Sequence, residues 1–191
     1  CSLVGSEMCI RDSSTVDQSA PYYRRDGYWN GAVWMPYQWM FFKSALDAGL
    51  ADFAYRIADT VLTLWQNECT ESYCCFEHFM IESRRGADWH QFSGLSSPIV
   101  QLFSAYYRPG TLTTGFDAFV RHTDWAPDNS ALNATLDFTA AGRSTVLAVL
   151  QPGPKAVTAS VPCTVVTRHD GLLELTFALD APCTVTISIH S

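Results

Sequence analysis

The residues best suited to chemistry are gathered in one stretch, Tyr73 to Pro98, with the sequence YCCFEHFMIESRRGADWHQFSGLSSP. It holds the carboxylates of Glu77, Glu82 and Asp88 among arginines, histidines, a tryptophan and glycines. Such a mixture is poor material for a hydrophobic core, because every polar group buried there would need a partner. The stretch therefore predicts a polar binding site on a loop between two helical segments.

A second passage rich in aromatic residues ends at Tyr28, Trp29, Asn30 and Gly31. Gly27 and the Asn30-Gly31 pair mark tight turns, which places the aromatic side chains on a loop. Sugars select aromatic rings beside polar groups, since a ring face packs on C–H groups while the polar groups bind hydroxyls. The alternative is a loop that anchors a helical hairpin to the core, and these residues alone favour neither interpretation.

Composition limits the classes of protein and of partner. The chain has 191 residues, of which 48% are hydrophobic and 13% aromatic, so it is expected to bury a core. Acidic residues outnumber basic ones by 19 to 12, the net charge is -7, and no basic stripe is present. We therefore expect no nucleic acid and no membrane surface as a partner. No run of about 18 apolar residues exists, so no transmembrane helix is predicted.

The seven cysteines contain no C-x-x-C pair. Because structural zinc sites usually draw ligands at such short spacings, no metal site is predicted, and no cofactor is expected.

Residues 1–13, CSLVGSEMCIRDS, share neither composition nor period with the rest of the chain. They closely resemble the translation of a sequencing adaptor. We therefore expect them to be an artefact without function, and the chain to be a fragment that lacks its natural N-terminal part.

The elements that must position these residues begin with helices. Pro36 suits the first turn of a helix that should end at Asp47, before Gly49. A second helix is expected over Leu50–Gln66, where apolar residues recur every four positions and predict one buried stripe. The members of this stripe are Phe53, Ile57, Val61 and Trp65. The short turn between the two helices predicts an antiparallel hairpin.

A third helix is expected after the central stretch. Ser97 suits its N-cap and Pro98 its first position, and Pro109-Gly110 ends it.

From residue 128 the hydrophobic period changes from helical to alternating. Strands are expected at Leu132–Phe138, Val146–Leu150, Val157–Val161, Val165–Arg168, Leu172–Phe177 and Val185–Ile189. Short strands separated by turns predict an antiparallel sandwich. The predicted class is α+β, with a tail at 1–13, a helical domain at 14–110, a connector at 111–127 and a β-sandwich at 128–191.

A resemblance to a known family rests on three phrases: Tyr28-Trp29-Asn30-Gly31-Ala32-Val33-Trp34-Met35-Pro36, Phe76-Glu77-His78-Phe79 and Trp89-His90-Gln91-Phe92-Ser93. With the helical hairpin, they look like the last third of an (α/α)6-barrel glycoside hydrolase. The closest pattern is the group of family 63 α-glucosidases, family 37 trehalases and mannosylglycerate-hydrolase-like enzymes. The resemblance covers residues 22–108 and implies part of a toroid of helical hairpins. The trailing strands resemble the small sandwich domains often attached to such barrels.

The resemblance also implies roles for single residues. Glu77 stands at the position of the general base of an inverting mechanism. The implied substrate-binding residues are Tyr28, Trp29, Asn30, Gly31, Trp34, Trp89, His90 and Gln91. By their own chemistry, Trp29 and Trp89 favour binding, whereas Trp34 favours packing. Glu82 is expected to be solvated or salt-bridged, and Asp88 either holds a hydroxyl or pairs with Arg85.

Two departures limit what the resemblance implies about the substrate. Asn30 stands where many family 63 members have Arg, and His78-Phe79 stands where Asn-Tyr is usual. The general acid of the resembling families is an aspartate upstream of the Trp-Asn-Gly segment, and Asp26 is a poor substitute because it lies in the substrate-binding loop.

We therefore expect a fragment of an inverting glycoside hydrolase that acts on an α-glucoside or related oligosaccharide and carries the base but not the acid. Its partners would be that substrate and the missing N-terminal part of the same barrel. The alternative is a non-catalytic carbohydrate-binding or scaffold module.

Overall fold

The structure is a computed structural model that describes residues 14–25 and 27–191. The expected artefact at 1–13 and the side chain of Asp26 therefore lie outside the described residues. The chain divides into two compact units. Unit 1 holds the chain up to Phe41 together with Tyr55–Leu102, and unit 2 holds Phe42–Ala54 together with Phe103–Ser191. No described helix combines the length and the hydropathy that crossing a bilayer requires.

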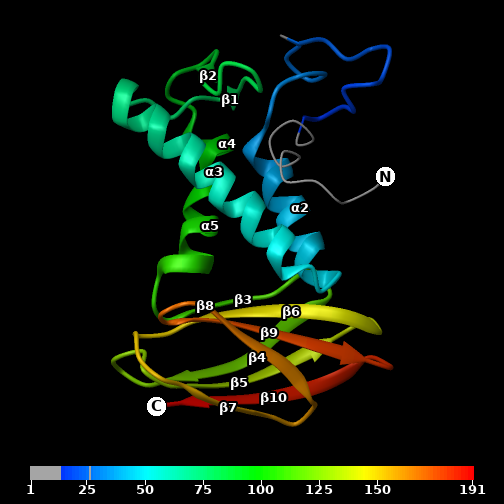
Figure 1. Cartoon of the computed structure of the whole chain (residues 1–191), viewed down its shortest axis with the longest axis vertical. Coiled ribbons are helices and arrows are strands. Elements are labelled where there is room, and N and C mark those ends of the chain that lie inside the picture. The colour runs from blue at the N-terminus through cyan, green and yellow to red at the C-terminus, as the bar shows by residue number, and fades with distance from the viewer. Residues whose placement is uncertain (1–13, 26) are drawn as a thin grey trace. The chain divides into compact units, whose positions relative to one another are not determined.

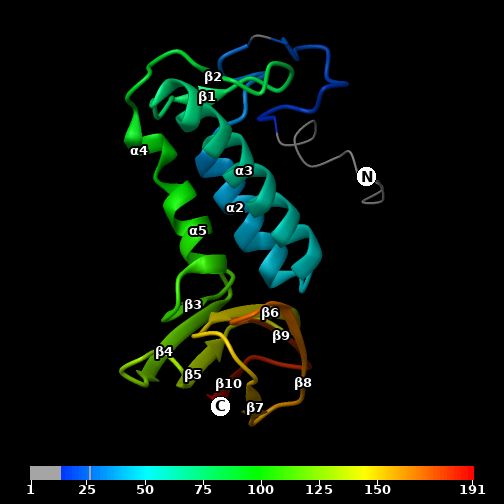
Figure 2. The same ribbon diagram turned by 60° about the vertical axis from the view of Figure 1, so that its left-hand side comes forward.

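The helical hairpin forms as the sequence predicts. Helix α2 spans Met35–Asp47 and helix α3 spans Ala51–Ser72 (Figure 1). The turn between them places Gly49 at φ 67°, a conformation that favours glycine. Its N–H bonds the Leu46 carbonyl at 3.0 Å, and the Leu50 N–H bonds the Ala45 carbonyl at 2.9 Å. This pair of bonds is a Schellman motif, which ends α2 and starts the antiparallel return seen in Figure 2.

Helix α3 continues past the predicted end at Gln66. Its buried face carries Ala54, Ile57, Ala58, Val61 and Leu64, whereas Phe53 and Trp65 are only half-buried. The last turn buries Glu68, and the Ser72 hydroxyl donates a 2.9 Å bond to the Glu68 carbonyl. The repeat of apolar residues that marks this helix in the sequence ends at Trp65. Polar groups stabilise the last turns of α3 instead, so the predicted C-terminal end of the helix lies too early in the chain.

The third helix is preceded by a short extra turn. Helix α4 spans Ser93–Ser96 and helix α5 spans Pro98–Tyr107. Ser97 between them has helical angles, φ -53° and ψ -31°, and its hydroxyl donates to the Gly94 carbonyl at 3.0 Å. The prediction of Ser97 as an N-cap is therefore wrong, because an N-cap side chain accepts a bond from a backbone N–H instead.

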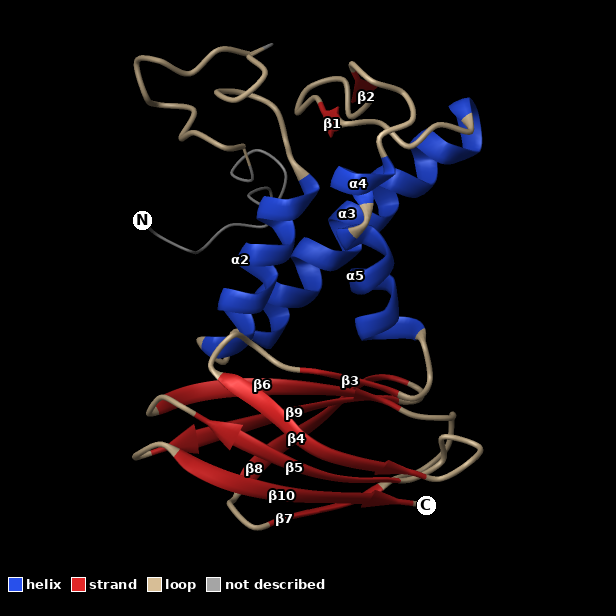
Figure 3. Ribbon diagram, turned by 180° about the vertical axis from the view of Figure 1, so that it is seen from behind, coloured by secondary structure: helices blue, strands red, loops and turns tan. Residues whose placement is uncertain are grey.

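Unit 2 contains two four-stranded antiparallel sheets, coloured red in Figure 3. One has the order β4-β5-β10-β7 and the other the order β3-β6-β9-β8. The strands are β3 Thr111–Thr113, β4 Ala118–Trp125, β5 Leu132–Phe138, β6 Gly142–Val149, β7 Ala156–Ala159, β8 Cys163–His169, β9 Leu172–Leu179 and β10 Cys183–His190. Mixed helix and antiparallel sheet confirm the α+β class, while the toroid stays a prediction.

One core joins the two sheets. Leu136 and Ile187 come from the first sheet and Val146 and Leu175 from the second, and all four belong to the same buried cluster. Alternation along β5 predicts this arrangement, since successive side chains of a strand face opposite sides. The expected connector at 111–127 is instead part of the sheets, because β3 pairs with β6 and β4 pairs with β5.

Polar contacts tie the helix ends of unit 2 to its strands and loops. The Asp47 carboxylate accepts the N–H groups of Phe116 at 2.7 Å and Asp117 at 3.1 Å. Arg168 on β8 donates to the buried Glu174 on β9 at 2.8 and 2.9 Å and to Asp52 on α3 at 2.5 Å. Asp47 at the end of α2 thus bonds backbone N–H groups of a loop, and Asp52 at the start of α3 shares the Arg168 guanidinium with the buried Glu174.

The Arg168 contact makes a testable prediction. Arg168→Met leaves the Glu174 carboxylate, 2% exposed, without its bidentate partner. Removing one partner of a buried pair should lower the free energy of unfolding by about 3 kcal/mol, measured by urea denaturation followed by circular dichroism. The matched control is Arg121→Met, because the Arg121 side chain is 68% exposed and pairs with Asp137. It should cost less than about 1 kcal/mol, and equal losses in the two variants would contradict the prediction.

Candidate active site

The stretch that carries Glu77 forms a small hairpin in unit 1. Strand β1 is His78–Phe79 and strand β2 is Gly86–Ala87, and His78 lies opposite Ala87 in the register. The backbone of Phe79 exchanges two hydrogen bonds with that of Val33, at 2.8 and 3.0 Å. The loop after the Trp-Asn-Gly segment is therefore paired directly with the hairpin, which brings the two predicted motifs together.

An ion pair fixes the hairpin to helix α3. The Arg85 guanidinium donates to the Glu68 carboxylate at 2.7 and 3.1 Å, and the Gly86 N–H donates to the same carboxylate at 2.8 Å. Arg85 also contacts Glu71 at 2.7 Å. The Arg85 bonds together with the Gly86 N–H lower the pKa of the buried Glu68 to about 2, although burial opposes this shift.

Aromatic rings form the other side of the site. Trp29 stacks on Trp34 with ring centroids 3.9 Å apart and planes 7° apart, and Trp34 stacks in turn on His78 at 5.0 Å. Tyr28 meets Trp29, Trp34 and His78 edge-on at 5.4, 4.9 and 5.3 Å. Trp34 is fully buried and its indole N–H donates to the Tyr28 carbonyl at 2.8 Å. These contacts fix the position of Tyr28 from both its ring and its backbone.

The Tyr28 hydroxyl contacts the carboxylate of Glu77, the predicted catalytic base. The Tyr28 phenol donates a hydrogen bond to Oε1 of Glu77, which lies 49 residues further along the chain. The bond to Glu77 raises the pKa of Tyr28 to about 12, because ionising the phenol would lose the bond and place two negative charges together. The phenol therefore remains a donor to Glu77 over the whole neutral range.

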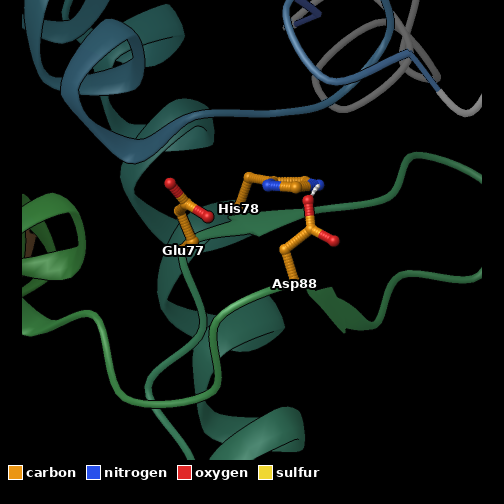
Figure 4. Close-up of side chains that lie close together, drawn as sticks. All are labelled: Glu77, His78 and Asp88. Atoms are coloured by element: carbon orange, nitrogen blue, oxygen red, sulfur yellow. Dashed lines mark ion pairs between the residues drawn. The ribbon is translucent and has the colours of Figure 1, made fainter.

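His78 and Asp88 lie beside Glu77, as Figure 4 shows. The His78 ring is 4% exposed and its Nε2 is 3.8 Å from Asp88 Oδ2. Burial lowers the pKa of His78, and the nearby Asp88 and Glu77 oppose this effect. At neutral pH the imidazole is accordingly neutral, with one nitrogen lone pair available.

In the sequence, His78 and Asp88 belong to the stretch predicted as a polar site, but His78 is given no role of its own. What brings the two together is the hairpin turn, where Arg84 takes φ 55° and the Met80 N–H bonds the Arg85 carbonyl at 2.9 Å. The paired register ends at His78 and Ala87; Asp88 follows with φ 61°, and the Glu77 N–H bonds the Trp89 carbonyl. Asp88 Oδ2 lies 3.8 Å from His78 Nε2, whereas Arg85, the partner named as one alternative from the sequence, pairs with Glu68 and Glu71 instead.

The remaining predicted residues divide by where their side chains lie. The Asn30 amide donates to the Tyr22 carbonyl at 2.7 Å, and Gly31 is buried, where an added Cβ would lie 1.8 Å from the Arg24 carbonyl oxygen. These two shape the turn. Trp34 is fully buried and supports Tyr28 and Trp29, so in this structure it packs rather than lines the site.

Trp89, His90 and Gln91 pair through the backbone with the segment that carries Glu77: Trp89 with Glu77 itself, and His90 and Gln91 with Cys75. The Trp89 carbonyl accepts the Glu77 N–H at 3.0 Å, and the His90 carbonyl accepts the Cys75 N–H at 3.1 Å. The Trp89 ring is 61% exposed and lies 5.8 Å from the His90 ring, while Gln91 is exposed and bridges to Cys75.

Glu82 forms an ion pair with Arg25 at the surface, which confirms the salt-bridged alternative expected for it.

Comparison with known families supports the resemblance seen in the sequence. Residues 11–80 match the family model described as the mannosylglycerate hydrolase MGH1-like glycoside hydrolase domain. The matched range contains Tyr28, Trp29, Glu77 and His78 and ends before Asp88. No curated protein matches the chain significantly. The resemblance to this group of glycoside hydrolases is confirmed for the matched part, which covers less than half of the chain.

The Glu68 ion pair predicts how stability depends on pH. The folded pKa of Glu68, about 2, lies below its ordinary value of 4.5, so its stabilising contribution is complete above pH 4.5 and is lost as the pH falls toward 2. The loss should be about 2 kcal/mol, less than the full shift implies because Arg85 is half-exposed. Urea denaturation between pH 6 and pH 2 measures it.

The control variants isolate this one carboxylate. Glu68→Gln should lower stability at neutral pH and flatten the pH dependence between 4.5 and 2. Glu71→Gln, which removes the exposed partner of the same arginine, should change stability by less than about 1 kcal/mol and keep the slope. An unchanged slope in Glu68→Gln would show that other groups cause the acid sensitivity.

Proposed function

We propose that the chain contributes the general base, Glu77, to a glycoside hydrolase that inverts configuration at the anomeric carbon. The observation that carries this proposal is the hydrogen bond from Tyr28 to Glu77, because it joins the two motifs of the resemblance within one family-matched segment. A base of this kind takes a proton from the water that attacks the sugar. Glu77 is suited to the task because the Tyr28 hydroxyl holds one of its two oxygens in place.

The two oxygens of Glu77 have different tasks in this mechanism. Oε1 accepts the Tyr28 hydroxyl and sets the plane of the carboxylate. Oε2 accepts the proton of the attacking water. A base must lie within hydrogen-bond reach of the proton that it abstracts, so fixing one oxygen fixes where that water is held.

Trp29 is the ring that we propose to pack against a sugar of the substrate. It is 52% exposed, and its stacking on the fully buried Trp34 holds it in one orientation. A fixed ring loses little conformational freedom on binding, and it offers a face to sugar C–H groups. Trp89, 61% exposed and joined to Glu77 through the backbone, is the second such ring.

The Asp88 carboxylate, which lies close to Glu77, does not suit the role of general acid. The Glu77 and Asp88 oxygens lie within 4.8 Å of each other, whereas inverting enzymes hold their two carboxyl groups about 6.5–9.5 Å apart to admit water. Both side chains also approach His78 from one hairpin. We propose that the acid is supplied from outside this chain, as the resemblance implies, and that the substrate is an α-glucoside or related oligosaccharide.

A second function is favoured by a groove on the outer face of the β5-β10-β7 sheet. Its cavity volume is about 430 Å³, and its polar lining includes Asn133, Thr135, Ser160, Thr186 and Ser188. Hydroxyl and amide groups in such a row suit sugar hydroxyls. Tryptophan, tyrosine and phenylalanine are not among its described lining residues, so the groove offers no such ring for a sugar to pack against. For this reason carbohydrate binding without catalysis ranks second.

The base assignment predicts the effect of an isosteric change. In a parent protein that contains this chain, Glu77→Gln should lower kcat by at least about 10²-fold while the oligosaccharide still binds, because the amide cannot take a proton. Steady-state hydrolysis and calorimetric binding measure the two effects. The control is Glu82→Gln, which changes only the surface pair with Arg25. Activity that survives Glu77→Gln, with sugar binding intact, would favour the second candidate.

The carboxylate spacing predicts the behaviour of the chain alone. The isolated chain of 191 residues should not hydrolyse an aryl glycoside, because Glu77 cannot both activate water and protonate the leaving oxygen on the opposite side. The measurement is release of the aryl group over hours at high protein concentration. Turnover that disappears in Glu77→Gln would mean that Asp88 completes the pair, and the inverting mechanism would be wrong.

A further inference from the structure

We propose that Glu77, His78 and Asp88 together bind a divalent metal ion of the first transition row. The three residues offer two carboxylate oxygens and one imidazole nitrogen, and these ligand atoms all lie within 4.8 Å of one another. The proposal rests on this geometry and not on the hydrolase function. It departs from the sequence-based expectation of no metal site, which considered only cysteine spacing.

The state of His78 is the observation that points to a ligand. The residue is 3% exposed, and its Nδ1 is buried without a hydrogen-bond partner in the described part of the chain. Its Nε2 has Asp88 Oδ2 as a neighbour at 3.8 Å, which is too long for a hydrogen bond. A buried imidazole nitrogen without a hydrogen-bond partner carries an uncompensated desolvation cost, which an ion bound at Nδ1 removes.

The ring lies between the two carboxylates. In Figure 4 one nitrogen of His78 is directed to Asp88 and the other is on the side of Glu77. Metal bonds to nitrogen and oxygen are about 2.0–2.2 Å long, so two ligand atoms on one ion can be up to about 4.4 Å apart. The ligand atoms of the three residues all lie within 4.8 Å of one another, so small side-chain rotations bring them within that limit. The Asp88 side chain is 61% exposed and can turn to complete the set.

The donor set selects the class of metal. Imidazole suits first-row transition metals, and carboxylates suit Mn²⁺. Neither group is a soft ligand of the thiolate kind. Mn²⁺ is the appropriate probe, because it prefers oxygen ligands and so avoids the free thiols of Cys69 and Cys74.

The test is a titration of the whole chain with Mn²⁺, followed by the paramagnetic resonance signal of the free ion. The wild-type chain should bind one ion, and Asp88→Asn and Glu77→Gln should each weaken binding at least about tenfold. Asparagine tolerates the backbone of Asp88, φ 61°, so Asp88→Asn should keep its circular dichroism spectrum. The matched control is Asp59→Asn, an exposed carboxylate of α3, which should bind Mn²⁺ like the wild type.

Two results would overturn the metal site: no binding at millimolar Mn²⁺, or binding that either Asp88→Asn or Glu77→Gln leaves unchanged. The outcome is separate from that of the hydrolase proposal. Mn²⁺ binding that depends on both residues would stand even if a parent protein hydrolysed no glycoside, and hydrolysis without Mn²⁺ binding would leave Glu77 as a base alone.

Discussion

The buried carboxylate of Glu68 is the constraint on which the candidate site depends. It sits in the last turn of α3 and is bonded by Arg85 and the Gly86 N–H, so it fixes one end of the short hairpin. The two strands of that hairpin contain only two residues each and would not be stable by themselves. A buried ion pair is costly unless its geometry is good, and here a backbone N–H satisfies part of the carboxylate.

The aromatic stack supplies the complementary support. Trp34 is fully buried between Trp29 and His78, and it bonds the backbone of Tyr28. A single buried ring thus orients Trp29, the proposed sugar-binding ring, on one side and His78, the proposed metal ligand, on the other. The Val33–Phe79 backbone pairing then joins the stack to the hairpin. The aromatic residues and the hairpin residues, which are separate binding candidates in the sequence, are therefore held together by one set of contacts.

The sequence predicted the local elements better than the long-range contacts. The α2–α3 hairpin and the later strands are encoded by period and turn residues, which are local signals. The end of α3 and the strands within 111–125 were missed because ion pairs and partner strands, not apolar period, stabilise them. Glu77 and Tyr28 were named as site residues through the resemblance, and their roles stay predictions. The place of His78 beside Asp88 depends on the fold of the hairpin, which no short motif displays.

The short distance between Glu77 and Asp88 explains why these two carboxylates do not suit the paired roles of acid and base. Both lie on the same small hairpin beside His78, with their ligand oxygens within 4.8 Å of each other. Carboxylates this close are too near to flank a glycosidic bond with water between them. The same closeness is what a metal ion requires of its ligands. A carboxylate that acts as a general base needs an acid further away than its own hairpin can provide.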